Sequence, residues 1–291
     1  MRILTSLIFK VTLSSMILTA PAMTTGVKGT GFEKPIGSDL PLPYYSSAVI
    51  KKFVHFNTLS TASERAEAEY TAAKERSFSS AALARKLELK MVLSEAVILY
   101  DYMSLEKTGL SEEAFEYAWR GYHNLLKKGR IQKQNVLSIC DFSQSSSSKR
   151  LYVIDLRHKK LLYRTYVAHG ANSGGEYASS FSNEKDSYKS SLGFYLTKKT
   201  YFGRNGLSLR IAGVDTGYND LAGKRNIVLH GSSYVSVKYM NANGTIGTSL
   251  GCPAMPLSMS PRIIRAVRNG SCFFIYHPTQ TYLDGSTIIN G

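Results

Sequence analysis

The sequence predicts a mainly β domain preceded by an α-helical region, and therefore an α+β protein overall. Beyond residue 129, apolar residues recur at every second position in short runs that Gly, Asn or Ser bound, which is typical of strands. Before residue 129, apolar residues recur at steps of three and four, which is typical of helices. Because no long helices alternate with the strands, we expect the sheet to be mostly antiparallel. With 43% hydrophobic residues in 291, the chain can bury a substantial core.

Residues 1 to 22 have the features of a secretory signal peptide. Arg2 precedes an apolar stretch, and Ala20-Pro21-Ala22 offers small residues where a signal peptidase cleaves. Lys10 interrupts the apolar stretch, and the alternatives are an N-terminal membrane anchor or a buried helix. No later apolar run reaches the length of about 18 residues that a membrane span requires. We therefore expect an exported protein of the periplasm or cell wall, with no membrane span once the signal is removed.

Two regions follow the signal. Residues 23 to 59 are rich in Gly, Pro and Ser, and the run from Pro35 to Pro43 excludes a regular helix, so a linker or surface arm is expected. Residues 60 to 109 form a helical region because Ala, Glu, Lys, Arg and Leu dominate up to Met103. One mostly apolar helix face is predicted in its second half: Leu83, Leu87, Met91, Ser94, Ala96, Ile98 and Leu99.

A second helix opens the next region, residues 110 to 285. Ser111 is a predicted N-cap, Glu112 and Glu113 place negative charge in the first turn, and Gly129 should end the helix. Its apolar stripe is predicted to pack into the core: Phe115, Ala118, Trp119, Tyr122, Leu125 and Leu126.

Seven strands are predicted after this helix. They cover residues 136 to 141, 151 to 156, 161 to 168, 193 to 196, 208 to 212, 226 to 230 and 272 to 276. A short helix over residues 261 to 267 should precede the last of them.

The chain is strongly basic. A formal net charge of +15 predicts attraction to polyanions. The basic residues are dispersed, and an exported protein meets anionic wall polymers and membrane surfaces, so nucleic acid is not an expected partner.

Three cysteines give the sequence an odd thiol count. Cys140 and Cys272 lie in apolar strand patterns, which favours core positions or a disulfide between the two. Cys252 instead lies in a glycine turn, Gly247-Thr248-Ser249-Leu250-Gly251-Cys252-Pro253. An unpaired thiol of this kind is either a buried structural residue or retained for its reactivity.

A histidine that the fold brings close to Cys252 would make it a nucleophile. His230 ends an apolar run and is followed by Gly231, 252 − 230 = 22 positions before the cysteine. His169 ends a similar run and is either the rival base or a supporting group. Successive N–H groups in the glycine turn, those of Gly251 and Cys252, could form an oxyanion hole.

Other chemistries lack their motifs. The sequence contains no H-E-x-x-H, no paired C-x-x-C, no acidic calcium loop, no G-x-S-x-G and no G-x-x-x-x-G-K. We therefore expect no metal and no cofactor. A zinc site built from His169, His230, Cys252 and an acidic residue is the competing alternative.

His230-Gly231 followed by Ser249-x-Gly251-Cys252 resembles the signature of the L,D-transpeptidase catalytic domain, the YkuD-like family, and in particular its murein branch. Further segments match in order: 150 to 155, 167 to 170, 181 to 183, 191 to 195, 225 to 231 and 249 to 254. The resemblance implies a β-sandwich or barrel in which Cys252 attacks a carbonyl of a peptidoglycan stem peptide and passes the acyl group to an amine of another stem.

The resemblance also implies the roles of the neighbouring residues. Cys252 would be the nucleophile, His230 the base, and Gly251 with Cys252 the oxyanion donors, supported by Ser249, the Gly231 carbonyl and His169. Arg225, Arg210 and Tyr234 are the expected substrate-binding residues. Carbapenem-type β-lactams would be covalent inhibitors.

Two positions depart from the wider family, and they bear on the reaction. Leu250 stands where His is frequent, and Ala254 where Asn or Arg is usual. The alternatives are hydrolysis of the stem peptide at the same site, as a carboxypeptidase or endopeptidase, and a basic wall-binding module without catalysis.

Overall fold

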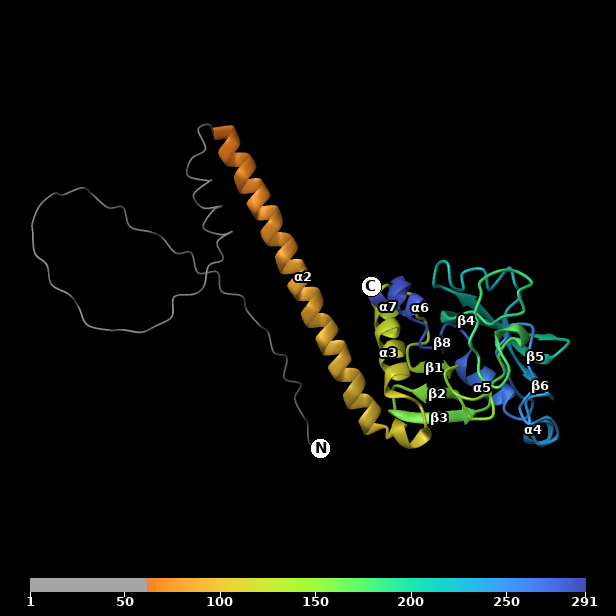
Figure 1. Cartoon of the computed structure of the whole chain (residues 1–291). Helices are drawn as coiled ribbons and strands as arrows, with labels where there is room; N and C mark the ends of the chain where they lie inside the picture. The colour runs from red at the N-terminus through yellow and green to blue at the C-terminus, as the bar shows by residue number, and fades with distance from the viewer. Residues whose placement is uncertain (1–61) are drawn as a thin grey trace, which may run out of the picture. The chain divides into compact units, whose positions relative to one another are not determined.

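The computed structural model describes residues 62–291, and the predicted signal peptide and linker lie outside these residues (Figure 1). Its elements are α2 (Ala62–Tyr102), η1 (Leu105–Thr108), α3 (Glu112–Lys127), β1 (Val136–Asp141), β2 (Leu151–Asp155), β3 (Lys160–Thr165), η2 (Ala171–Ser173), β4 (Gly193–Gly203), β5 (Gly206–Gly213), β6 (Val228–Ser232), α4 (Val237–Asn243), β7 (Ala254–Pro256), α5 (Ser260–Val267), β8 (Cys272–Tyr276), α6 (Gln280–Gly285) and α7 (Thr287–Asn290). The predicted α+β class with a mainly β domain is confirmed. Among these helices, none is long and apolar enough to cross a membrane.

Helix α3 begins and ends where local signals predict. Ser111 Oγ accepts a hydrogen bond from the Ala114 N–H at 3.2 Å, which satisfies one of the free amides of the first turn. Phe115, Trp119 and Leu125 of its apolar stripe are buried. Gly121 lies so close to the sheet that a Cβ there would be 2.0 Å from the Phe194 ring, so only glycine permits this approach.

Helix α2 differs from the prediction in how its apolar residues are used. The single apolar face predicted from the sequence is wrong, because the structure divides its members between two faces. Ala96 is buried in the core of the β domain, together with Tyr100, whose hydroxyl donates to the Leu110 carbonyl. Leu87 and Met91 are exposed instead. A helix that buries one face and leaves another apolar face open has a surface that the fold itself does not use.

Eight strands form one sheet in the order β3-β2-β1-β8-β4-β5-β6-β7. Within the described residues, the β1–β8 and β6–β7 pairs are parallel and the other neighbours antiparallel. The chain after β3 crosses to the opposite edge, where Ala168 bridges Ala254 of β7 and Gly170 bridges Ser249. These bridges bend the sheet into a near-barrel and bring His169 beside the Cys252 turn.

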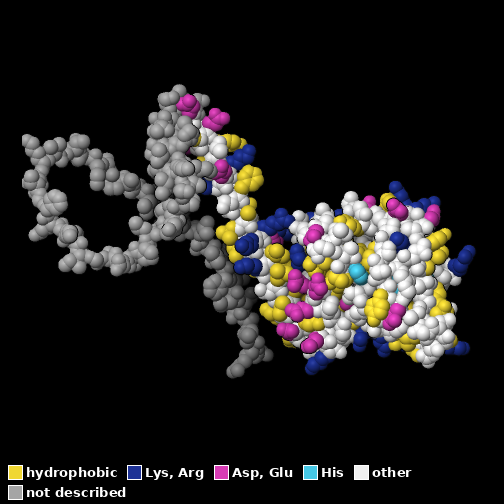
Figure 2. Space-filling view, viewed as in Figure 1, with side chains coloured by type: hydrophobic (Ala, Val, Ile, Leu, Met, Phe, Trp, Pro, Cys, Tyr) yellow, Lys and Arg dark blue, Asp and Glu magenta, His cyan; other side chains and the backbone are white. Residues whose placement is uncertain are grey.

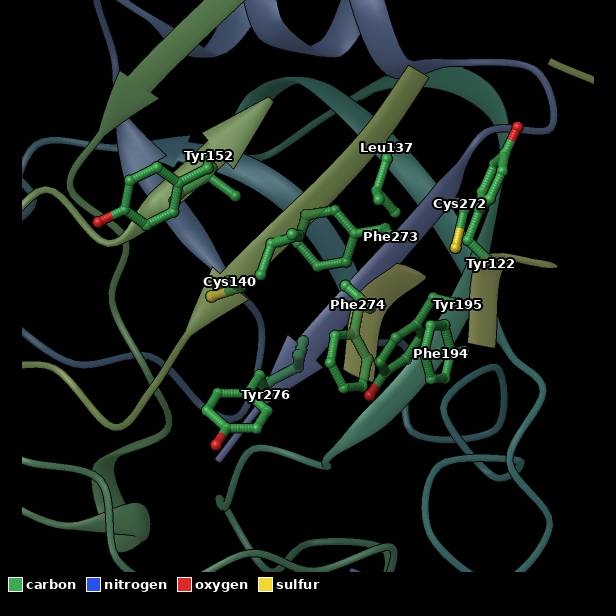
Figure 3. Close-up of a cluster of buried hydrophobic side chains, with 14 of the residues drawn as sticks. Tyr122, Leu137, Cys140, Tyr152, Phe194, Tyr195, Cys272, Phe273, Phe274 and Tyr276 are labelled. Carbon is green, nitrogen blue, oxygen red and sulfur yellow. The ribbon is translucent and has the colours of Figure 1, made fainter. Parts of the chain in front are cut away.

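The core lies on both faces of the central strands (Figure 3). Phe194 and Phe274, paired across β4 and β8, stack at a centroid distance of 4.1 Å on the face covered by α3. Successive residues of a strand point to opposite faces, so Tyr195 and Phe273 pack on the other side.

Cys140 and Cys272 are fully buried free thiols, so the predicted core role is confirmed and the alternative of a disulfide between them is wrong. Cys140 pairs with Ile275 in the β1–β8 register, three positions from Cys272. An odd offset places the two side chains on opposite faces of the sheet, where no bond can join them. The structure thus leaves Cys252 as the one thiol that is not fully buried among the described residues.

Candidate active site

Cys252 lies in a bend two residues before β7, next to β6, the strand that carries His230. His230 of β6 pairs with Ala254 of β7, so Val228 lies opposite Cys252. The Val228 N–H points at Cys252 Sγ with an N···S distance of 3.4 Å. Since alternate residues of a strand share a face, Val228 and His230 point to the same side of β6, and the Val228 N–H contact places the Cys252 sulfur next to this strand.

The chain before β6 also contributes to the thiol site. Asn226 has a left-handed φ of 56°, and its carbonyl oxygen lies 3.8 Å from Cys252 Sγ as the acceptor of the thiol proton. Asparagine tolerates this conformation better than most residues. The turn therefore supplies one acceptor for S–H, while Val228 supplies one donor for the sulfur.

His230 is held in a defined tautomer. Its Nδ1 lies 3.0 Å from the Gly231 carbonyl oxygen, which can only accept, so Nδ1 carries the proton. In the neutral ring the lone pair is then on Nε2. Gly231 has a second role, since a Cβ there would be 2.4 Å from Ser260 Oγ at the start of α5.

Ser249 braces the turn that presents Cys252. Its Oγ accepts from the Gly251 N–H at 3.1 Å and donates to the Cys252 carbonyl at 2.6 Å. The Ser249 N–H donates to the His169 carbonyl at 2.9 Å, which ties the turn to the segment after β3. Gly251 adopts a φ of 112°, and a Cβ there would be 2.8 Å from the Lys189 carbonyl, so this position requires glycine.

His169 is buried with both ring nitrogens engaged. Its Nδ1 accepts from Arg150 Nη2 at 2.7 Å, and its Nε2 donates to the Gly174 carbonyl at 3.1 Å. Burial and the neighbouring Arg150 charge lower the pKa of His169 to about 4, so the ring is neutral at physiological pH. A ring in this state has no lone pair left for a thiol proton or a zinc ion. Among residues 62–291, no group of three or more His, Cys, Asp or Glu side chains could hold a metal.

A comparison of the whole sequence with models of protein families identifies the family. The model of the L,D-transpeptidase catalytic domain matches residues 106–276, which is more than half of the 291-residue chain. The chain belongs to the L,D-transpeptidase catalytic domain family. No curated protein is similar to this L,D-transpeptidase-family chain at a significant level.

Solved L,D-transpeptidase structures resemble the chain distantly. One from Mycobacterium smegmatis is 11% identical with a TM-score of 0.31, covering 49% of this chain and 59% of that one. L,D-transpeptidase 3 from Mycobacterium tuberculosis, in complex with a faropenem-derived adduct, is 11% identical with a TM-score of 0.33, covering 49% and 60%. One from Stackebrandtia nassauensis is 14% identical with a TM-score of 0.29, covering 64% and 78%. The chain thus spans 59% of the length of the first of these proteins, and family membership depends on the sequence match alone.

The structure of this L,D-transpeptidase-family protein places the predicted substrate-binding residues unequally. Arg225 donates to the carbonyls of Ser182 and Lys189, both at 2.6 Å, and also to the hydroxyls of Ser187 and Ser191. Its guanidinium therefore fastens the loop over residues 182–191 beside Gly251. This network occupies the donors that would otherwise bind a substrate carboxylate.

Arg210 and Tyr234 lie nearer to open surface. Arg210 pairs with Val228 across β5 and β6, is exposed, and sits over the Tyr201 ring at 4.8 Å. The register puts Arg210 on the same face of the sheet as Val228, whose N–H contacts the Cys252 sulfur. Tyr234 is half-buried against Gly247 in the turn that leads to Cys252.

Two features near the thiol were not predicted from the sequence. Arg150 is fully buried, lies 4.7 Å from the centroid of the Phe142 ring, and fixes His169. A charged residue directly before the apolar run at 151 was the only local signal of it. The 182–191 loop and its Arg225 clamp had no such signal, because their contacts join segments about 40 residues apart.

Proposed function

We propose that this protein is a peptidoglycan L,D-transpeptidase that transfers an acyl group from a stem peptide, through a thioester on Cys252, to an amine of another stem. The observation that carries the proposal is the position of Cys252 next to β6, where the Val228 N–H contacts its sulfur two residues before His230. Family membership of residues 106–276 supports the same reaction.

The resting sulfur is a thiol. Burial raises the pKa of Cys252, and the Val228 N–H and the Arg225 charge oppose this only in part. His230 Nε2 would therefore remove the S–H proton as the sulfur attacks, rather than hold a preformed ion pair. The C–S bond forms, the scissile C–N bond breaks, and His230 returns the proton to the departing amine.

The second half of the cycle reverses these roles. An incoming amine attacks the thioester carbonyl and gives its proton to His230, and sulfur leaves to recover the thiol. The oxyanion would lie beside the Cys252 N–H, because the Gly251 N–H is directed at Ser249 Oγ. This differs from the role predicted for Gly251, whose contribution would be to hold the turn.

Two exposed residues, Leu250 and Arg210, would contact the substrate. Leu250 is 70% exposed beside Cys252, where the wider family often has a histidine, so this rim is apolar. Arg210, which is exposed opposite Val228 on β5, would bind a stem-peptide carboxylate. A β-lactam would acylate the same sulfur, as the faropenem-derived adduct of the Mycobacterium tuberculosis protein suggests by analogy. We further propose that the chain is exported and acts at the cell wall.

The test combines muropeptides with mass spectrometry. Purified protein with tetrapeptide muropeptides should give cross-linked dimers, and with faropenem should give an acyl adduct on the Cys252 peptide. Cys252→Ala should give neither, and dimers formed by Cys252→Ala would refute the nucleophile. Release of the terminal residue without dimers would indicate hydrolysis instead. Binding to sacculi with no adduct would indicate a wall-binding module.

A further inference from the structure

Helix α2 carries an exposed apolar stripe that the β domain does not cover. Leu87, Met91 and Ile98 are 53%, 73% and 66% exposed. Figure 2 shows yellow hydrophobic side chains among the charged ones along the visible part of this helix. Phe78, Leu89 and Val97 are exposed on other faces of the same helix, and this much exposed apolar area marks an interaction surface.

The stripe has heptad spacing. Starting at Tyr70, steps of three and four residues reach nine positions, none of them charged: Tyr70, Ala73, Ser77, Ser80, Ala84, Leu87, Met91, Ser94 and Ile98. We call these nine residues the α2 seam. Six of the nine are apolar and three are serine, and a mostly apolar a and d pattern over about four heptads fits a coiled coil.

The α2 seam lies on a different face of α2 from the core residues Ala96 and Tyr100, whereas Glu88 and Glu95, which flank the seam on one side, contact α3. Ala96 and Tyr100 enter the core, while Glu88 pairs with Lys127 of α3 at 2.7 Å. At about 100° per residue, Tyr100 lies about 160° around the helix from Ile98. A partner helix on the α2 seam would therefore pack beside α3, with Glu88 and Glu95 between the two helices.

The flanking charges fit a second copy of this helix in parallel orientation. In a parallel pair, each g residue of one helix faces the e residue five positions later on the other. Glu69 then meets the Lys74 of the second copy, and Lys90 meets its Glu95; all four are exposed, and Glu95 also lies 3.3 Å from His123 Nε2 of α3. The other two combinations, Arg76 with Ala81 and Leu83 with Glu88, place no like charges together.

We propose that two copies of this chain associate through the α2 seam as a parallel, in-register coiled coil over residues 70–98. The seam serines and alanines supply less apolar area than leucines would. The dimer should therefore be reversible, with its population rising with protein concentration. Two β domains would then be held together as one unit.

Sedimentation of the full chain tests the association. The wild type should shift from monomer to dimer as its concentration rises. Met91→Glu should weaken dimerisation at least about tenfold, because it buries a charge at a core position of the seam. Leu89→Glu is the matched control: Leu89 is 40% exposed on the same helix outside the α2 seam, and its variant should dimerise like the wild type. A wild type that stays monomeric, or equal effects of the two variants, would overturn the proposal and assign the stripe to another occupant.

Two further variants test the orientation. In a Cys252→Ala background, Met91→Cys should cross-link two chains on oxidation, since equivalent a positions face each other only in a parallel in-register pair. Leu89→Cys in the same background should not cross-link. Separately, Glu69→Lys and Lys74→Glu should each weaken the dimer by roughly two- to tenfold, and the double variant should recover it. Failure of the double variant to recover, or cross-linking of Leu89→Cys alone, would contradict this register.

Discussion

The segment over residues 167–170 and strand β6 share a local pattern, an apolar run that ends in His-Gly, yet the fold uses their histidines differently. In His169, one ring nitrogen is hydrogen-bonded to Arg150 and the other to the Gly174 carbonyl. In His230, only Nδ1 is hydrogen-bonded, to the Gly231 carbonyl. Both lie at the turn that carries Cys252, since the His169 carbonyl anchors Ser249 and the β6 register aligns His230.

This comparison shows that closeness to the proposed nucleophile, Cys252, is not enough to make a histidine a base. A base needs an uncommitted lone pair, and only His230 has one available on Nε2. His169 acts on the site through its backbone, as part of the scaffold. Substitution of His230 should therefore reduce the reaction rate, whereas substitution of His169 should change the stability of the fold.

The largest expected effect is on the reaction at His230. His230→Gln should slow acylation of Cys252 by faropenem by about 10² to 10⁴-fold, because general base catalysis is lost. The rate of adduct formation, followed by intact mass, measures this, and thermal unfolding should stay close to that of the wild type. If His169→Gln slowed acylation as much while remaining folded, the comparison would be reversed.

The next largest effect is on stability at His169. Its folded pKa of about 4 lies below the unfolded value near 6.5, so the unfolded chain binds more protons between these pH values. The resulting stability is fully present above pH 6.5 and is lost as pH falls toward 4, up to about 3 kcal/mol. Urea unfolding at a series of pH values checks this. His169→Gln, which cannot be protonated, should remove this share of the acid sensitivity, and an unchanged slope in that variant would refute the assignment.

A smaller effect on the acylation rate is expected at Ser249, which links the His169 segment to the Cys252 turn. Ser249→Ala removes the hydroxyl that links the Gly251 N–H to the Cys252 carbonyl, hydrogen bonds worth about 1 kcal/mol each. Acylation should slow by roughly tenfold, since the turn loses its geometry while Cys252 and His230 remain. Ser249→Thr, which keeps the hydroxyl, is the control and should retain more of the rate than Ser249→Ala.

The smallest effect separates charge from clamping at Arg225. Arg225→Gln removes a positive charge that lowers the pKa of Cys252, so the pH profile of thiol alkylation should move to higher pH. Arg225→Lys should keep the profile near that of the wild type while loosening the 182–191 loop. Identical profiles for the Gln variant and the wild type would show that Arg225 acts only as a clamp.

The sequence predicts most of the elements whose signals are local. Ser111 and its acidic first turn place α3, and the apolar alternation places β1 and β8 at their observed bounds. It does not predict β7, whose three residues are too few for a period to appear. Nor does it separate the two faces of α2, because the choice between Ala96 and Met91 depends on contacts with residues far along the chain.

The candidate site divides in the same way. The sequence selects Cys252 and His230 as a pair because spacing and glycines are local features. It leaves His169 as a rival, since what distinguishes the two rings is a hydrogen bond to Arg150, 19 positions away, and another to the Gly174 carbonyl. Arg225 could likewise be chosen as a polar residue near the site, but its four partners depend on how the 182–191 loop folds back.

The buried setting of Cys252 also bears on how long the protein stays active. Oxidants attack the thiolate far faster than the thiol, and an exposed thiolate is lost to sulfenic acid and beyond. Burial raises the pKa of Cys252 and so keeps the sulfur protonated at rest, while Cys140 and Cys272 lie out of reach as disulfide partners. In the proposed reaction the sulfur would thus be shielded from oxidative damage between turnovers, and it would react only when a substrate carbonyl and His230 act on it together.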